Sequence, residues 1–437
     1  MIQASIIQGV LLALLPLDLF KQLPIVLLLI GGVSAFLLTY LLTFAVRAFS
    51  YRVGWLDRPA ARRVHTVAVP RLGGVAMFLS FLIVSLLLYT SAPVDAHSQY
   101  SEQAIYWLFI AAATLTVLVH AYDDVMGLKP LPKIIAQTVA VLIILAPGRT
   151  TFHGILLFSF NNPFPWIHQP LFYLFVDDNI IRLASIPAVL FTWFWIAGMM
   201  NTVNLIDGVD GLATGVVGIT ALFITVISWM LHQNSIAILA GIFTGAVLGF
   251  LPHNWHPAKI FMGDSGAMFL GLGLAVLSTM GGAKLALALM VLGVPILDVA
   301  VVALNRVRRS QRPWHYDKTH LHHRLLATGL GVRQICYLFY SLTLAFGLLA
   351  ISLSNVRHLA HFYKFIGVAL VGVAMIALIA WIDYRQRQRG IHIKLGKSDL
   401  GIPTEAGMVT PTPMQPADSS ERQDRSPASE LRSEQPL

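Results

Sequence analysis

Residues 187–231 read PAVLFTWFWIAGMMNTVNLIDGVDGLATGVVGITALFITVISWML. Two apolar runs, 187–206 and 211–231, stand in this stretch, and the polar sequence Asn204-Leu-Ile-Asp207-Gly-Val-Asp210 lies where they meet. About 20 predominantly apolar residues are enough to cross the hydrocarbon core of a bilayer as a helix. The stretch therefore predicts two membrane-spanning helices that place amide and carboxylate side chains at one membrane surface.

The rest of the chain repeats this pattern. Of the 437 residues, 56% are hydrophobic and 12% are charged, whereas a soluble domain carries about 25% charged residues. A membrane β-barrel would need short strands of alternating polarity, which the sequence does not have. We therefore predict an all-α integral membrane protein with about eleven transmembrane helices. The expected spans are near 23–46, 73–92, 104–121, 132–147, 187–206, 211–231, 236–252, 266–280, 285–304, 335–353 and 364–384.

We expect three segments along the chain. Residues 1–22 form an interfacial or membrane-embedded lead-in, because no basic region precedes their apolar stretch as it would in a signal peptide. Residues 23–386 form the polytopic domain, in which 148–186 is expected to fold as a short hairpin on the outer surface. Residues 387–437 form a tail rich in Pro, Ser, Glu and Gln, which predicts disorder.

The positive charge is concentrated in two loops, which follow the first and the ninth predicted span. The loops carry Arg47, Arg52, Arg58, Arg62, Arg63 and Arg71, and Arg306, Arg308, Arg309, Arg312, Lys318, Arg324 and Arg333. The positive-inside rule makes both loops cytoplasmic, so the N-terminus is expected outside and the C-terminus inside. Because the loops are short, interrupted and next to the membrane, we expect them to contact membrane lipids and no nucleic acid.

Acidic and amide residues cluster at the ends of the predicted spans. The clusters are Asp123-Asp124, the Asn204–Asp210 segment, and Gly263-Asp264-Ser265. Pairs of spans separate the clusters, so all should reach the same cytoplasmic side. Carboxylates at membrane depth are costly and usually functional, and two adjacent carboxylates repel each other unless a cation lies nearby. Helix capping explains one such residue well but the whole set poorly, which favours a metal-dependent centre that acts on an anion.

The accompanying residues indicate a phosphate ligand. Carboxylate and amide oxygens suit Mg²⁺ or Mn²⁺, and Lys133 and Gln137 share one helix face that could offer a cation and an amide to a phosphate. Phe261 provides an aromatic face for a base, although anchoring at the membrane interface explains it equally well. The basic loop after the ninth predicted span also contains His320, His322, His323 and Arg324. The three histidines could bind zinc, or they could donate to a pyrophosphate with Arg324 making a bidentate contact, or the segment could form only a solvated basic loop.

Several segments resemble those of a known family over roughly residues 20–385. They are Asp57-Arg-Pro, Arg62-Arg63-Val-His65, Pro70-Arg71-Leu-Gly73-Gly74, Asp123-Asp124 with Gly127-Leu128, Asn201-Thr-Val-Asn204-Leu-Ile-Asp207-Gly-Val-Asp210-Gly-Leu-Ala, Pro257-Ala-Lys-Ile-Phe-Met-Gly-Asp264-Ser-Gly and Asp317-Lys-Thr-His320-Leu-His322-His323-Arg324-Leu325. The chain resembles the polyprenyl-phosphate N-acetylhexosamine-1-phosphate transferases of glycosyltransferase family 4, and among them the bacterial UDP-GlcNAc branch.

The resemblance implies an enzyme of the bacterial cytoplasmic membrane. Its reaction would transfer GlcNAc-1-phosphate from a UDP-N-acetylhexosamine to undecaprenyl phosphate, release UMP and start a cell-envelope polysaccharide such as lipopolysaccharide or teichoic acid. The resemblance implies that Asn204 and Asp264 hold Mg²⁺ (or Mn²⁺) and that Asp123 positions or deprotonates the lipid phosphate. The further catalytic residues that it implies are Asp124, Asp207, His322 and His323. Contacts with the nucleotide sugar are implied for Asn254, Phe261, Asp210, His320, Arg324 and Lys133.

Two alternatives stay open. The phospho-MurNAc-pentapeptide transferase branch carries consecutive histidines followed by an acid in its last cytoplasmic loop, whereas here Leu321 interrupts the run and Arg324 follows it. A transporter of lipid-linked sugars would carry inverted repeats and midplane binding residues, whereas the polar clusters here lie at span ends. The sequence also leaves open a homodimer and the role of Asp298.

Overall fold

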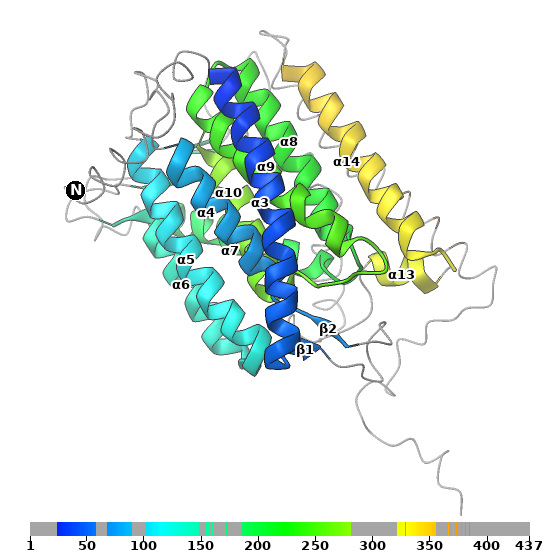
Figure 1. Cartoon of the computed structure of the whole chain (residues 1–437). Coiled ribbons are helices and arrows are strands. Elements are labelled where there is room, and N and C mark those ends of the chain that lie inside the picture. Colours follow the sequence, from blue (N-terminus) through cyan, green and yellow to red (C-terminus); the bar gives the residue numbers. More distant parts are fainter. Residues whose placement is uncertain are drawn as a thin grey trace, which may run out of the picture. The chain divides into compact units, whose positions relative to one another are not determined.

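The computed structural model describes residues 24–57, 68–89, 102–147, 154–157, 159–160, 172–173, 186–280, 321–327 and 329–354, and single residues between 366 and 384 (Figure 1). The predicted lead-in, the tail and the span at 285–304 lie outside the described residues, as does most of the span at 364–384.

Helices make up most of the described chain. They are α3 (Pro24–Val53), α4 (Gly73–Leu88), α5 (Glu102–Met126), α6 (Pro130–Leu145), α7 (Ile186–Ile206), α8 (Leu212–Met230), α9 (Asn234–Asn254), α10 (Gly263–Thr279), α13 (Leu321–Ala327) and α14 (Val332–Ser354). Among the described residues, six helices are long and apolar enough to cross a membrane, namely α3, α5, α7, α8, α9 and α14. The prediction of a multi-pass helical membrane protein is confirmed, and the count of eleven spans stays a prediction.

Two short antiparallel ribbons make the fold mostly helical rather than wholly helical. Strand β1 (Leu56–Asp57) pairs with β2 (Val69–Pro70), so that Leu56 lies opposite Pro70. Strand β3 (Ser159–Phe160) pairs with β4 (Phe172–Tyr173). The second ribbon confirms paired strands within 148–186, and the first leads the chain into α4.

Helix α10 lies at the centre of the bundle. It contacts α4, α5, α7, α8 and α9, and nearly all of its side chains are buried. A helix that is apolar on all sides is expected in the interior. Asp264 lies in the first turn of α10, so the packing of the core fixes the position of this carboxylate.

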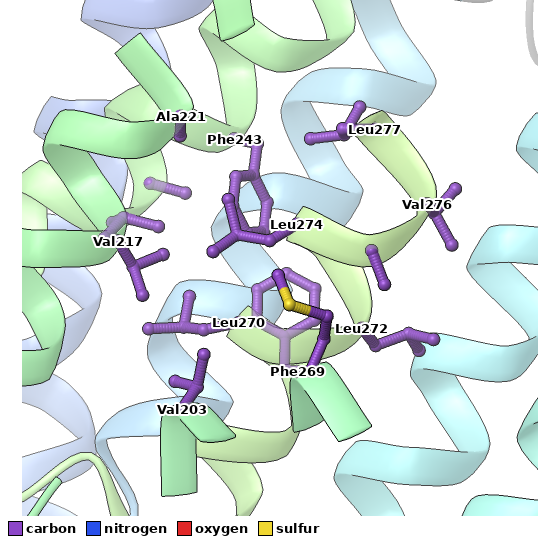
Figure 2. Packing of buried hydrophobic residues seen from close by; sticks show 14 of the residues in the cluster. Val203, Val217, Ala221, Phe243, Phe269, Leu270, Leu272, Leu274, Val276 and Leu277 are labelled. Carbon is purple, nitrogen blue, oxygen red and sulfur yellow. The ribbon is translucent and has the colours of Figure 1, made fainter. Parts of the chain in front are cut away.

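An aromatic cluster holds α10 to its neighbours. Phe81 of α4, Phe109 of α5, Phe243 of α9 and Phe269 of α10 are fully buried, and their ring centroids lie 5.5 to 5.8 Å apart in the contacting pairs. Figure 2 shows Phe243 and Phe269 packed among the leucines of α10 and valines of α7 and α8. Such edge and tilted contacts stabilise aromatic pairs beyond the area that they bury.

Helices α3 and α9 approach each other closely because glycines of α9 face α3. A Cβ atom on Gly245 would lie 2.0 Å from the carbonyl oxygen of Gly32, and one on Gly249 would lie 2.3 Å from that of Phe36. Small residues at such a contact let membrane helices pack backbone to backbone. The outward face of α3 exposes Leu29, Val33, Leu37 and Leu41, as expected for a helix that contacts lipid.

Candidate active site

Charged side chains from four parts of the chain meet at one end of the bundle. We call this group, Arg71, Asp123, Asp124, Lys133 and Asp264, the charge cluster. Asp123 and Asp124 lie in the last turn of α5, Lys133 near the start of α6, Asp264 at the start of α10, and Arg71 between β2 and α4. The prediction that the acidic clusters share one side is therefore confirmed for the described residues.

Lys133 joins two of the carboxylates. Its Nζ atom lies 2.8 Å from Asp264 Oδ2 and also contacts Asp123 Oδ2. The connection between α5 and α6 explains the contact, because Leu128 N donates to Asp123 Oδ1 at 2.6 Å and α6 starts at Pro130, a residue suited to a first helical turn. The Lys133 side chain is 27% exposed, whereas that of Asp123 is 5% exposed. The Lys133 side chain therefore stays partly exposed, whereas the Asp123 side chain is buried.

Asp124 has a different role from its neighbour. Its Oδ1 atom accepts from Asp264 N at 2.7 Å, and its Oδ2 atom accepts from Ser265 N at 3.0 Å and from Ser265 Oγ at 2.8 Å. Two of these donors are backbone N–H groups at the start of α10, which have no partners within the helix, and a negative charge at a helix N-terminus is stabilising. Asp124 thus caps α10 and fixes the position of Asp264. This capping role of Asp124 was not predicted from the sequence.

Arg71 was not predicted as a site residue, because in the sequence it is one of several arginines of a basic loop. Arg71 Nη2 lies 3.7 Å from Asp264 Oδ1, and Arg71 Nε lies 3.9 Å from Asp124 Oδ1. The available signal was the position of one arginine between Pro70 and Gly73-Gly74, directly before a span and on the same side as the acids.

The segment around Arg71 is joined to the start of α10 by backbone hydrogen bonds. Phe261 N donates to Pro70 O at 2.8 Å, and Phe261 O accepts from Gly73 N at 3.0 Å. Gly263 has φ +71°, and a Cβ atom there would lie 2.1 Å from Arg71 O and 2.4 Å from Asp124 Oδ2. Only glycine adopts this conformation readily and leaves that space, so Gly263 allows the charge cluster to close around Asp264.

The end of α7 adds amides and one acid to the site. Asn204 Nδ2 lies 3.3 Å from Asp264 Oδ1, and Asn201 Nδ2 donates to Gln137 Oε1 at 2.9 Å. The predicted common face of Lys133 and Gln137 is confirmed, since both point to this region. Gln137, however, is 3% exposed and also contacts Met268 Sδ. It holds α6 to α7 and α10 and does not offer its amide to an external phosphate.

Asp207 follows α7 directly and lies in the field of the charge cluster. Desolvation raises its pKa well above the usual range for an aspartate, and the carboxylates of Asp264, Asp124 and Asp210 act in the same direction, while Arg71 opposes them. Asp207 therefore carries a proton more readily than an ordinary solvent-exposed aspartate.

A second polar group, which we call the loop junction, joins the turn before α8 to the chain after α9. It consists of Asp210, Gly211, Asn254, His256 and Tyr340. Asn254 Oδ1 accepts from Gly211 N at 3.1 Å and from Thr214 Oγ1 at 2.8 Å, and Asn254 Nδ2 donates to Ile260 O at 3.2 Å. Asn254 is 2% exposed. Its side chain holds the two loops together, and the expected contact with a nucleotide sugar stays a prediction.

Asp210 is held from both sides in the same junction. Its Oδ2 atom lies 2.8 Å from His256 Nδ1 and accepts from Ala258 N at 3.1 Å. Helix α14 closes the junction, because Tyr340 donates its hydroxyl proton to Gly211 O and Arg333 donates to His256 O at 3.1 Å. His256, Arg333 and Tyr340 were not predicted as site residues, since only the folded chain brings α14 to these loops.

The remaining predicted residues are less fully described. Phe261 is half-buried and its backbone forms the contacts with Pro70 and Gly73. Arg324 is half-buried on α13, a helix that packs against α14. His320 and the side chains of His322 and His323 lie outside the described residues.

Asp264 and Asn204 have the donor chemistry that a magnesium ion requires. Both carry hard oxygen donors, and a half-turn of the Asn204 amide would direct its oxygen toward Asp264. Mg²⁺ commonly takes one or two carboxylates and completes its shell with water and phosphate oxygens. Within the described part of the chain, no three His, Cys, Asp or Glu side chains form a metal-binding group. The pair therefore fits an ion shared with a phosphate ligand.

The sequence is also similar to those of known proteins. Residues 106–282 match the family described as Glycosyl transferase family 4. The chain is 30% identical over 338 residues to a probable undecaprenyl-phosphate N-acetylglucosaminyl 1-phosphate transferase of Bacillus subtilis, which covers 75% of this chain and 85% of the relative.

Two further relatives come from other bacteria. A decaprenyl-phosphate N-acetylglucosaminephosphotransferase of Mycobacterium tuberculosis is 32% identical over 71% of this chain and 78% of its own length. An undecaprenyl-phosphate alpha-N-acetylglucosaminyl 1-phosphate transferase of Escherichia coli K12 is 26% identical over 76% of this chain and 84% of its own length. The similarity thus extends over most of both chains, and the family match over residues 106–282 includes the end of α5, α6 and the start of α10. The protein belongs to glycosyl transferase family 4.

Proposed function

We propose that this protein transfers GlcNAc-1-phosphate from UDP-GlcNAc to a polyprenyl phosphate, most simply undecaprenyl phosphate, and releases UMP. This step starts the synthesis of a cell-envelope glycan. Three curated relatives with this type of activity in their names support the proposal. The charge cluster supports it independently, because a reaction between two phosphates needs fixed cations and metal ligands at a membrane surface.

The observation that carries the proposal is the bridging position of Lys133. Its ammonium group contacts the carboxylates of Asp123 and Asp264, and the Lys133 side chain as a whole is 27% exposed. A cation held by buried acids is preorganised to bind a phosphate oxygen as negative charge spreads in the transition state. Membrane-embedded charge of this kind is costly without a function.

The reaction balances without an added reagent. An oxygen of the lipid phosphate forms a bond with the β-phosphorus of UDP-GlcNAc, and the bond from that phosphorus to the oxygen bridging to the α-phosphate breaks. UMP leaves with the electron pair, and the sugar remains joined to the transferred phosphate. Because a lipid phosphate is already ionised at neutral pH, the residues need to orient it and to stabilise charge more than to remove a proton.

Each member of the charge cluster has a part in this scheme. Asp264, with Asn204, would hold Mg²⁺, which supplies neutralisation of the pyrophosphate oxygens when bound. Lys133 binds a phosphate oxygen, and Asp123 orients Lys133. Asp124 caps α10 and keeps Asp264 in position. Asp210 and Phe261 remain candidates for contact with the uracil.

We also propose that the charge cluster faces the cytoplasm. The C-terminal end of α3 lies at the same end of the bundle as β1 and β2 (Figure 1). By sequence Arg47 and Arg52 belong to the last two turns of α3, and basic residues mark the cytoplasmic side. Arg52→Cys in a Cys336→Ser background should react with a membrane-impermeant maleimide only in inverted vesicles. Labelling in intact cells would contradict this orientation.

The activity can be tested with purified protein, undecaprenyl phosphate, MgCl₂ and a panel of UDP-sugars. We expect UMP release with UDP-GlcNAc, and we expect EDTA to stop the release and Mg²⁺ or Mn²⁺ to restore it. UMP release only with UDP-MurNAc-pentapeptide would assign the related branch. Counterflow of a lipid-linked sugar without any UMP would support a transporter and contradict the proposal.

A further inference from the structure

Arg71 differs from the surface arginines of this protein in its surroundings. Its guanidinium group lies between two carboxylates, at 3.7 Å from Asp264 Oδ1 and 3.9 Å from Asp124 Oδ1. The Asp124 side chain is 1% exposed and that of Asp264 is 20% exposed, whereas Arg71 is 34% exposed. Two acids, each less exposed than the arginine, thus hold an Arg71 side chain that is partly open to solvent.

The backbone fixes the position from which this arginine extends. Pro70 O, on one side, accepts from Phe261 N at 2.8 Å, and Gly73 N, on the other, donates to Phe261 O at 3.0 Å. Arg71 O itself lies against Gly263, at the start of α10. The segment therefore cannot move without α10, and the guanidinium group keeps its place relative to Asp264.

The contacts of Arg71 leave its N–H groups available. Both distances to the carboxylates exceed the length of a hydrogen bond, so the acids attract the guanidinium group without engaging those N–H groups. Lys133 lies at Oδ2 of Asp264 and Arg71 lies at Oδ1. Two cationic side chains, both partly exposed, thus lie at different oxygens of one carboxylate, and the proposed reaction joins two phosphates.

We propose that Arg71 is a further catalytic residue, which binds an oxygen of one substrate phosphate while Lys133 serves the other. The inference rests on the proposed function. A guanidinium group presents a planar fork that matches phosphate geometry and stays charged at every relevant pH. The phosphate belongs either to the nucleotide sugar or to the polyprenyl phosphate, and kinetics can distinguish these two sources.

The first test compares Arg71→Ala, Arg71→Lys and the control Arg52→Ala, which removes an exposed arginine at the end of α3. Arg71→Ala should lower kcat/KM by about 10²–10³-fold, and Arg71→Lys should recover part of the loss. Arg52→Ala should retain wild-type kinetics. A raised KM for UDP-GlcNAc would assign the donor phosphate to Arg71, and a raised KM for undecaprenyl phosphate would assign the acceptor. Full activity of Arg71→Ala would overturn the proposal.

The second test does not depend on turnover. It measures the binding of UDP relative to uridine, and of undecaprenyl phosphate relative to undecaprenol, to wild type and Arg71→Ala. One of these ratios should fall in the variant, while its melting temperature stays near that of wild type. Unchanged ratios would show a structural role instead. A loss of both activity and melting temperature that Arg71→Lys does not relieve would show the same. If wild type released no UMP, the proposed function would fail, and these ratios would still decide the role of Arg71.

Discussion

The charge cluster and the loop junction lie close together in the protein but are built in different ways. In the charge cluster, ions contact ions, and the cations Lys133 and Arg71 are more exposed than their partners. In the loop junction, side chains pair mainly with backbone groups, and Asn254 is fully buried. The first arrangement can exchange a protein partner for a ligand phosphate, whereas the second holds two loops in place.

This contrast leads to different expectations for substitutions. Removing one ion from a partly buried cluster changes the field in which a phosphate reacts, so the main effect should be on catalysis. Removing a side chain that satisfies buried backbone groups leaves those groups without partners, so the main effect should be on stability. The ratio of lost activity to lost stability therefore distinguishes the two regions.

The largest effect is expected for Asp264→Asn. The rate of UMP release should fall by about 10³-fold or more, because most of the catalysed rate is lost when one member of a group of cooperating catalytic residues is removed. The melting temperature should change little, since Lys133 keeps Asp123 as a partner. Glu102→Gln is a suitable control, because this buried carboxylate lies at the other end of α5 and contacts Ser235. Substantial activity in Asp264→Asn would show that Asp264 is not a ligand of the proposed metal ion.

Lys133→Ala should have the next largest effect. We expect kcat/KM to fall by about 10²–10³-fold, since the substitution removes the cation that bridges Asp123 and Asp264. Lys133→Arg should restore part of the activity because it restores the charge. Steady-state rates of UMP release at saturating and limiting substrate measure the effect. A variant within tenfold of wild type would contradict a direct role for the ammonium group.

Asn254→Ala should mainly lower stability. The substitution leaves Gly211 N, Thr214 Oγ1 and Ile260 O without their partner, and each unsatisfied buried group costs about 1–3 kcal/mol. Thermal melting of the purified protein, with and without UDP-GlcNAc, measures the loss. A variant that melts like wild type but no longer binds the nucleotide sugar would instead identify Asn254 as a ligand contact, as the family resemblance implies.

The smallest effect is expected for Tyr340→Phe. This change removes the hydroxyl group that donates to Gly211 O and should lower the free energy of unfolding by about 1 kcal/mol. Tyr337→Phe is the matched control, since Tyr337 is 58% exposed and its ring, like that of Tyr340, contacts Trp255. We expect both variants to keep near-normal kinetics. A loss of activity in Tyr340→Phe without a loss of stability would show that α14 contributes to the reaction and not only to the structure of the loop junction.

Much of the fold could be predicted because hydropathy depends on local sequence. Apolar runs of spanning length coincide with helices wherever the structure describes them, and their spacing predicted that Asp123, Asn204 and Asp264 would meet at one end. The common face of Lys133 and Gln137 also follows from helical periodicity. These inferences required only that each helix be long enough to cross the membrane and that successive helices end on alternate sides of it.

The contacts that complete the site could not be predicted, because they arise from packing between distant elements. Nothing local distinguishes Asp124, which caps α10, from Asp123, which holds Lys133. The place of Arg71 depends on hydrogen bonds between its segment and Phe261. The pairing of Asp210 with His256 depends on the conformation of the loop after α9.

The most direct test of the central claim follows the β-phosphate of the donor. Purified protein would receive UDP-GlcNAc labelled with ³²P at the β-position, undecaprenyl phosphate and Mg²⁺, and the lipid and nucleotide products would be separated. A phosphotransferase that works through the charge cluster should move the label into the lipid fraction and release unlabelled UMP. Label that remains in UDP, with the sugar alone on the lipid, would contradict the proposed reaction.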